Sequence, residues 1–414
     1  MELNKKQLEL YVFLTAAFAA VFGFLFSRAV LSISTIIICA NGFLWGDIRG
    51  KWQAFKQQPF LIGLTLLFFI PLISGLWSND LGLWWFRCQQ KIPLLVLPFS
   101  LVYIQQLKSK HIVQFHVLWI FTIFLGSLWS LSLYIGDPDQ MIQLYKVSKV
   151  LPTWAENDHI RFTIAIIISI LFALYMEQNN SLKGSAVKWI IRGISIWLII
   201  FLHIISVKTG LIGLYLVILP VYGIHLWKKK KALSILLIFI ALITLGLSVR
   251  MIPTLRERIN YMIYDHNLWS NEKFTGTDSD SNRILSLKAG WEIWKNNFFA
   301  GVGYGDIRSD VDKWFDKNVP IVKSEQRFLP LNQWIFAGST TGIVGVIIFS
   351  LIICLPFFNK KWTGTLTSLC FWIFMTILFT YESTIEDQRG VYLFSFMTLW
   401  WHLLININHH NKLS

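Results

Sequence analysis

The residues of this sequence that are best suited to binding or catalysis are cations in or beside the connections between long apolar runs. Five of them matter most: Arg87, Lys91, Arg161, Lys208 and Arg283. Arginine donates paired hydrogen bonds to phosphate and stays charged at any physiological pH. In so apolar a chain, a basic cavity predicts an anionic, lipid-linked ligand, and a sugar on a polyprenyl diphosphate meets both demands. The alternative is that the cations pair with carboxylates, namely Asp80, Asp158, Glu382 and Glu386.

Two of these cations have distinctive neighbours. Lys208 is the only Lys or Arg within the apolar run 201–214. A lone cation at membrane depth costs free energy and usually serves a function, although a lysine there can also extend its ammonium group to the headgroups. Arg161 opens another apolar run just after His159, and histidine is the residue type whose ordinary pKa lies near neutral. We interpret His159 as an interfacial polar residue rather than a catalytic base.

A glycine-rich turn follows a Trp-rich amphipathic segment late in the chain. Gly301, Gly303 and Gly305 alternate with Val302 and Tyr304. Glycines let the backbone approach a phosphate or a sugar, so the three are candidate substrate-binding positions. The pattern is neither a dinucleotide-binding fingerprint nor a P-loop, and a plain turn is the alternative interpretation.

Uncharged polar residues and carboxylates complete the set of candidates. Asn332 and Gln333 open an apolar run in which small residues allow close helix packing. Their amides need partners at a helix start, so we expect them to position an acceptor. Glu382 and Glu386 lie in the last polar connection, where they either pair with the cations or orient an acceptor sugar.

The elements that hold these residues are predicted to be membrane-spanning helices. Hydrophobic residues make up 55% of the 414-residue chain and charged residues only 14%, too few for a water-facing surface of this size. Lipid requires every backbone group to be paired internally, which favours helices. The apolar runs predict an all-α, polytopic protein with about twelve spans. These spans are expected at 8–26, 29–46, 60–77, 92–105, 112–136, 162–177, 188–206, 209–227, 232–249, 333–358, 363–380 and 389–406.

Charge placement predicts the orientation. Lys and Arg are concentrated in alternate connections, most of all at 228–231, and such connections stay in the cytoplasm. We therefore expect both termini in the cytoplasm and the long connection outside. The predicted organisation is helices 1–9 within 1–249, a large periplasmic loop at 250–332, and helices 10–12 with a cytoplasmic tail at 333–414.

Other function classes fit less well. The net charge of +14 is spread between apolar runs rather than gathered in a basic domain, so nucleic-acid binding is not expected. The four cysteines form no CxxC pair, which indicates neither a disulfide framework nor a zinc site. The first apolar run lacks a small-residue cleavage site, so we interpret it as a span rather than a signal peptide.

Four segments, in this order, resemble the O-antigen ligase and polymerase superfamily. They are 76–98, the turn 208–210, Arg283 with the Trp-rich helix and glycine turn that follow it, and Asn332 with Gly342 and Gly345. The stretch 382–390 also resembles the end of such proteins. The resemblance covers most of the chain from residue 60 onward, and it rests on the order and spacing of the segments rather than on one motif.

The resemblance implies an inverting, metal-independent glycosyltransferase without a cofactor, in the bacterial inner membrane. Such proteins move a glycan from undecaprenyl diphosphate to an acceptor at the periplasmic face in polysaccharide and lipopolysaccharide biosynthesis. The acceptor is lipid A–core for a ligase and another carrier-linked repeat unit for a polymerase. Membrane lipids and glycan assembly proteins are further expected partners. The family's diphosphate-binding arginines correspond to Arg161 and Arg283.

One departure from the family pattern bears on the chemistry. Ligases carry a histidine, proposed as the base, where this chain has Leu331. The base then comes from Glu325, Asp306, His159 or Glu382, or the protein is polymerase-like, or it is inactive. A transporter of the same lipid-linked glycan is the rival from another class. It would require polar residues in the cytoplasmic halves of the spans, where the sequence offers little beyond Arg192. A non-catalytic membrane partner is the third interpretation.

Overall fold

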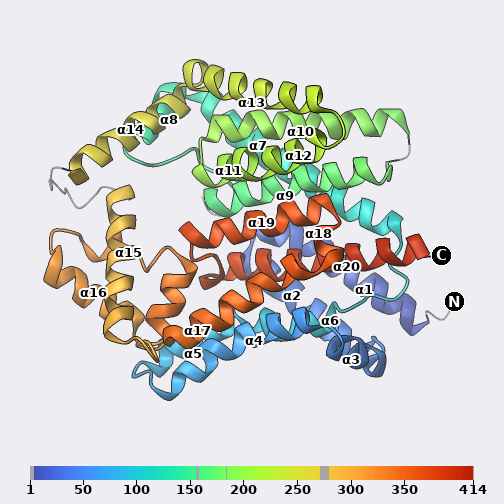
Figure 1. Ribbon diagram of the computed structural model, residues 1–414, viewed down its shortest axis with the longest axis horizontal. Helices are drawn as coiled ribbons and strands as arrows, with labels where there is room; N and C mark the ends of the chain where they lie inside the picture. Colours follow the sequence, from blue (N-terminus) through green and yellow to red (C-terminus); the bar gives the residue numbers. More distant parts are fainter. Residues whose placement is uncertain (1–3, 155–157, 183, 271–278, 414) are drawn as a thin grey trace. The chain divides into compact units, whose positions relative to one another are not determined.

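In the computed structural model the chain is built from helices. The structure describes residues 4–154, 158–182, 184–270 and 279–413, and these residues form α-helices, short 3-10 turns and one π-helical stretch, with no strand among them (Figure 1). By length and composition, nine of the described helical stretches can cross a membrane. They are α1 (Lys5–Phe26), α4 with η1 (Pro59–Leu76), α7 (Ser109–Gly136), α9 (His159–Gln178), α10 (Ser185–Ile205), α11 to α12 (Lys208–Trp227), α13 (Lys231–Met251), α17 (Gln333–Phe358) and α20 (Gln388–Leu413).

The all-α, multi-pass prediction is confirmed, and against the twelve predicted spans the described residues give nine candidates, or ten if one bent helix pair is a single span. Helix α2 (Arg28–Leu44) counts as a span only together with α3 (Ile48–Lys56), and the pair is bent by 102°. Helix α19 (Leu366–Tyr381) is apolar but has only 16 residues. The predicted span 92–105 is α6 (Ile92–Ser100), a nine-residue helix with Pro98 inside it. At 1.5 Å per residue such a helix covers about 14 Å of a hydrocarbon core about 30 Å thick.

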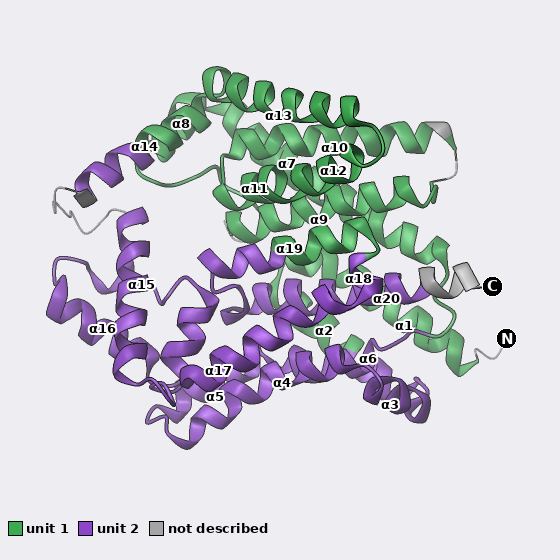
Figure 2. Cartoon of the chain, viewed as in Figure 1, with its two compact units in different colours: residues 1–38, 105–261, 364–374 green, residues 39–104, 262–363, 375–414 purple. Residues whose placement is uncertain are grey.

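The chain forms two compact units, which Figure 2 colours separately. Unit 1 comprises residues 1–38, 105–261 and 364–374. Its central helix is α9, which is apolar on every face and packs against α7, α10 and α11. In the same unit α12 (Leu219–Trp227) packs against α13.

Unit 2 comprises residues 39–104, 262–363 and 375–414. Helix α4 (Pro59–Ile73) packs against α6 and α17, and α20 packs against α6. Helix α15 (Ser279–Asn296) packs against α17 and against α16 (Ile307–Asn318). The segment 250–332 is therefore largely helical, since it holds α14 (Pro253–Ser270), α15 and α16.

Candidate functional site

Unit 2 gathers six of the candidate residues, together with Tyr304, into one charged cluster. Helix α5 (Leu81–Gln90) and the residue after it provide two cations, and its first turn is capped by the Asp80 carboxylate, which accepts from the Leu83 N–H at 2.8 Å. Helix α15 provides a third cation, α17 an amide, and the segment around η4 (Thr384–Glu386) two carboxylates. The members of the charged cluster are Arg87, Lys91, Arg283, Tyr304, Gln333, Glu382 and Glu386.

Lys91 and Glu386 form a buried ion pair at the centre of the charged cluster. The Lys91 Nζ lies 2.8 Å from Glu386 Oε1 and donates a second hydrogen bond to the Ile385 carbonyl at 2.7 Å. The two side chains are only 3% and 7% exposed. Burial lowers the pKa of the Lys91 ammonium, and the Glu386 carboxylate opposes that shift. The pair thus takes two opposite charges out of water, and their attraction offsets that cost only because they lie so close together.

Glu386 is also held by two uncharged groups. Its Oε1 accepts from the Gln333 Nε2 at 2.7 Å, and the Tyr304 hydroxyl lies 3.5 Å away. Burial raises the pKa of Tyr304 well above its ordinary value, and the neighbouring Glu386 adds to the rise. The phenol therefore stays protonated and can donate. The second oxygen, Oε2, is buried and has no hydrogen-bond partner within the described ranges.

Arg283 and Glu382 form a second pair that is open on one side. The Arg283 Nη1 donates to Glu382 Oε1 at 2.8 Å. The carboxylate is 5% exposed, whereas the guanidinium side chain is 32% exposed. Arg283 can therefore reach a ligand from the surface while Glu382 fixes its position.

Arg87 is the least committed cation of the charged cluster. Its guanidinium carbon lies 5.9 Å from the Phe336 ring centre, and the residue is 9% exposed. Its buried Nε has no hydrogen-bond partner among residues 4–154, 158–182, 184–270 and 279–413. Burial lowers its pKa, and the charge of Glu386 opposes that shift. A buried guanidinium without an acceptor leaves strong donors unsatisfied, and an anion would satisfy them.

The glycine turn, residues 301–305, packs its backbone against a break in α17. Helix α17 is broken at Gly342, where φ is 66° and ψ is −164°. The turn fills the break: the Val302 N–H donates to the Ser339 carbonyl at 2.9 Å and the Gly303 N–H to the Thr340 carbonyl at 2.8 Å. Gly301 and Gly303 themselves have φ of 66° and 90°, which favour glycine.

The backbone N–H groups of the glycine turn are all used by the protein itself. The Gly301 N–H donates to the Asn297 carbonyl at 2.8 Å, and the Gly305 N–H donates to the Ser78 hydroxyl at 3.2 Å. A Cβ at Gly305 would lie 2.3 Å from the Asp80 carbonyl oxygen. The close approach that the glycines permit is therefore to neighbouring protein backbone. A substrate-binding role for Gly301, Gly303 and Gly305 stays a prediction.

Asn332 caps α17. Its Oδ1 accepts from the Ile335 N–H at 2.9 Å, and its Nδ2 donates to the Thr380 carbonyl at 2.7 Å. Gln333 is likewise engaged at both ends, since its Oε1 accepts from the Ile385 N–H at 3.4 Å. Both amides thus fix the segment 380–386 against the start of α17. That Asn332 and Gln333 also position an acceptor stays a prediction.

Arg161 and Lys208 belong to unit 1. Arg161 stands in the first turn of α9 with its Nη1 3.7 Å from Asp158 Oδ1, and Asp158 also caps the helix by accepting from the Arg161 N–H at 3.1 Å. Lys208 is the half-buried first residue of α11 (Lys208–Ile212). The prediction that all five cations share one cavity stays a prediction.

The four candidate bases have different surroundings. Asp306 fixes the backbone at Asn79 and Asp80, because its carboxylate accepts from the Asn79 N–H, the Asn79 side chain and the Asp80 N–H at 2.8, 3.1 and 3.0 Å. Glu325 is exposed on η3 (Ser324–Gln326). His159 begins α9 in unit 1. Glu382 is the candidate that lies in the charged cluster.

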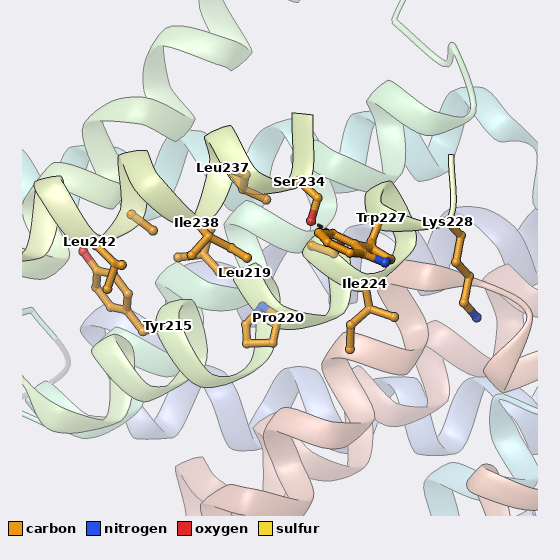
Figure 3. A pocket seen from close by; sticks show the side chains of 12 residues that line it. Tyr215, Leu219, Pro220, Ile224, Trp227, Lys228, Ser234, Leu237, Ile238 and Leu242 are labelled. Carbon is orange, nitrogen blue, oxygen red and sulfur yellow. Dashed lines mark hydrogen bonds between the residues drawn. The ribbon is translucent and has the colours of Figure 1, made fainter. Parts of the chain in front are cut away.

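An apolar groove lies in unit 1 between α12 and α13. It encloses about 430 Å³, and its two ends carry Tyr215 and Lys228 (Figure 3). The Ser234 hydroxyl faces the groove but already donates to the Gly223 carbonyl at 2.8 Å. The lining suits a hydrocarbon chain better than a phosphate or a sugar.

Sequence reasoning missed two contributors to the charged cluster. Tyr304 was noted only as part of the glycine turn, although an aromatic hydroxyl between turn glycines is a signal that it reaches inward. Phe336, which lies under Arg87, carries no such signal, because apolar residues surround it in the sequence. Among the described residues, no three His, Cys, Asp or Glu side chains are grouped as metal ligands would be.

Comparison with known proteins adds one match. A family model described as O-antigen ligase matches residues 193–350, which include Lys208, Arg283, the glycine turn, Asn332 and Gln333. No curated protein matches the chain.

Proposed function

We propose that this chain, which belongs to the O-antigen ligase superfamily and is a membrane glycosyltransferase of the ligase or polymerase type, uses a polyprenyl diphosphate donor. It would transfer the glycan from undecaprenyl diphosphate to an acceptor at the periplasmic face of the inner membrane. Both termini would then lie in the cytoplasm. The acceptor we propose first is lipid A–core, as for a ligase; the alternative is a carrier-linked repeat unit, as for a polymerase.

The observation that carries this proposal is the pair of arginines in unit 2. Arg87 is buried with its Nε unpartnered by any described residue, and Arg283 is one-third exposed and held from behind by Glu382. Two guanidinium groups in one unit match a diphosphate, which offers oxygens for paired hydrogen bonds. Neutralising the diphosphate as it leaves lowers the barrier to transfer. Arg161, to which the resemblance assigns diphosphate binding, and Lys208 belong to unit 1 and stay predicted donor-binding residues.

Glu382 is the base that we favour. When the diphosphate binds Arg283 and neutralises its charge, the Glu382 carboxylate that holds Arg283 at 2.8 Å can accept a proton. The acceptor hydroxyl oxygen then forms a bond to the anomeric carbon and gives its proton to Glu382. The bond from that carbon to the diphosphate oxygen breaks, and the electron pair leaves with the polyprenyl diphosphate. Attack from the opposite face inverts the anomeric centre.

Gln333 and Lys91 would act through Glu386 in this scheme. They hold the carboxylate at 2.7 and 2.8 Å, four positions along the chain from Glu382, so they fix the segment that carries the base. Asn332 fixes the same segment through the Thr380 carbonyl.

The test compares three variants in a strain that lacks the chromosomal gene. Arg283→Ala removes the diphosphate contact, Arg283→Lys keeps the charge but not the paired donors, and Glu382→Gln keeps an acceptor for Arg283 but cannot take a proton. Surface polysaccharide is measured on gels, the carrier-linked pool by mass spectrometry, and protein level by immunoblot of membranes. We expect Arg283→Ala to abolish transfer and Glu382→Gln to slow it by about 10²–10⁴-fold.

The outcomes separate the alternatives. Full-length glycan stranded on the carrier, with bare lipid A–core, indicates a ligase, whereas accumulated single repeat units indicate a polymerase. Wild-type glycan in Arg283→Ala would remove the arginine from the mechanism. An unchanged carrier-linked pool with a normal surface in the deletion strain would favour a non-catalytic partner, and repeat units trapped on the cytoplasmic side would favour a transporter.

A further inference from the structure

A polar pocket opens in unit 2 beside the glycine turn. It encloses about 460 Å³. Its lining comes from the end of α4 and η1, from the end of α15, from the turn and from the first turns of α16, and consists of Trp77, Asn79, Asn297, Gly301, Val302, Asp306, Ser309, Asp310 and Lys313. None of its side chains belongs to the charged cluster. The pocket is a separate place where a ligand can bind.

The lining chemistry matches a sugar. Trp77 leaves 37% of its surface exposed and offers the face of an indole, on which the C–H groups of a pyranose can stack. Asn79, Asn297 and Ser309 line the pocket with amide and hydroxyl groups. The Asn297 Nδ2 donates to the Ile293 carbonyl at 3.0 Å and the Ser309 hydroxyl to the Asp306 carbonyl at 2.8 Å, so their oxygens and the second Asn297 amide hydrogen can bind sugar hydroxyls. The Asn79 amide is held in place by Asp306 at 3.1 Å, so this wall is preformed.

The charge of the pocket disfavours a phosphate. The Lys313 ammonium is paired with Asp310 at 2.9 Å, which neutralises the only cation in the lining. The Asp306 carboxylate remains and accepts its bonds from backbone and amide N–H groups. The pocket is therefore net negative, and an anionic diphosphate would be repelled where an uncharged or amino sugar would not.

The glycine turn joins this pocket to the charged cluster. Gly301, Val302 and Asp306 line the pocket, whereas Tyr304 of the same turn reaches Glu386 at 3.5 Å. Two residues of chain span less than about 7.6 Å. A diphosphate held by Arg87 and Arg283 would therefore have the pocket within a few sugar lengths.

We propose that the polar pocket is a subsite for an uncharged or amino sugar of the transferred glycan, beyond the sugar that reacts. Trp77 stacks on the ring and Asn297 binds its hydroxyl groups. The inference rests on the proposed function, because it takes the glycan to be the substrate. It assigns to Trp77 a contact with the glycan itself, which the chemistry at the diphosphate does not require.

The test separates this subsite from the transfer chemistry. Purified full-length protein is assayed with the carrier-linked glycan of its own strain. Trp77→Leu removes the aromatic face, Trp77→Phe keeps one, and Trp291→Leu is the matched control, since Trp291 is an exposed tryptophan of α15 outside the pocket. We expect Trp77→Leu to raise KM for the glycan by about three- to tenfold with kcat unchanged, and Trp77→Phe to restore most of it.

A second measurement uses the unmodified protein. Hydroxyl-radical footprinting is read at Trp77 and Trp291 with and without the oligosaccharide released from the carrier by mild acid. We expect protection at Trp77 alone. Equal KM for Trp77→Leu and Trp291→Leu, or no protection of Trp77, would overturn the subsite while an inactive Arg283→Ala left the proposed function standing. Full activity of Arg283→Ala would instead overturn the proposed function.

Discussion

The buried pair of Lys91 and Glu386 gives the sharpest stability prediction. Replacing Glu386 by Gln keeps the shape and one acceptor oxygen but removes the charge that faces the Lys91 Nζ at 2.8 Å. Lys91 is 2% exposed, so water cannot take over the role of the carboxylate. Its remaining partner is the Ile385 carbonyl at 2.7 Å. Breaking a buried pair in this way costs about 3–5 kcal/mol, because one charge is left uncompensated.

The reverse and double replacements complete a cycle. Lys91→Met leaves Glu386 with the donors of Gln333 and Tyr304, so we expect a smaller loss than for Glu386→Gln. The double variant removes both charges, and a buried pair replaced by uncharged groups is often close to neutral. We therefore expect the double variant to be more stable than Glu386→Gln, with a coupling free energy of about 2 kcal/mol or more.

The assay is equilibrium unfolding of the purified protein in mixed micelles as the fraction of SDS is raised, followed by circular dichroism. Lys188→Ala is the control: its pair with Glu177 lies 3.2 Å apart on side chains that are about one-third exposed. Such a pair contributes less than about 1 kcal/mol. If Glu386→Gln costs no more than Lys188→Ala, or if the double variant is the least stable of the set, the reasoning from burial is wrong.

Further predictions concern the break in α17, Tyr304 and Arg87. Gly342→Ala should destabilise the protein by about 1–3 kcal/mol, since its φ is 66° and a Cβ would lie 2.1 Å from the Phe299 carbonyl oxygen. Gly246 of α13 has open space around it, so Gly246→Ala should be neutral or stabilising in the same SDS titration. Because the folded-state pKa of Tyr304 is raised, its contribution to stability is complete below pH 10 and is lost as pH rises beyond that value, so Tyr304→Phe should flatten the loss of stability between pH 10 and 12. A wild-type slope in that variant would show that Tyr304 titrates normally. Arg87→Met should leave folding intact or improve it while lowering donor affinity, measured as KM for the carrier-linked glycan, and an unchanged KM would exclude Arg87 from the diphosphate site.

Much of the architecture was predictable because the insertion of a segment into a membrane depends on its local composition. A run of about 20 apolar residues must be helical in lipid whatever its neighbours are, and nine of the predicted spans coincide closely with helices such as α9 and α13. The predicted spans without a long helix of their own are at segments where the chain is apolar but the helix is short or interrupted. Residues 92–105 read as a span by hydropathy, yet Pro98 and the end of α6 at Ser100 limit the helix to nine residues.

The candidate residues were identifiable by type, but their partners were not. Arg283 and Glu382 stand 99 positions apart, and Lys91 and Glu386 stand 295 apart. No periodicity relates such positions, so their pairing follows only from the packing of α15, α17 and the end of the chain. The same holds for the glycine turn. Its N–H groups donate to carbonyls of α17 beside the break at Gly342, where φ is 66°, and the sequence does not predict that break.

The sequence by itself determined that the chain is a polytopic helical membrane protein with unusual cations between its apolar runs, because hydropathy and charge are properties of each segment alone. Only the tertiary structure decided which of those cations are neutralised. It pairs Lys91 and Arg283 with carboxylates and leaves the Arg87 Nε without a partner in the described chain. That difference depends on the burial and distance of groups far apart in sequence, and these quantities exist only after the helices pack.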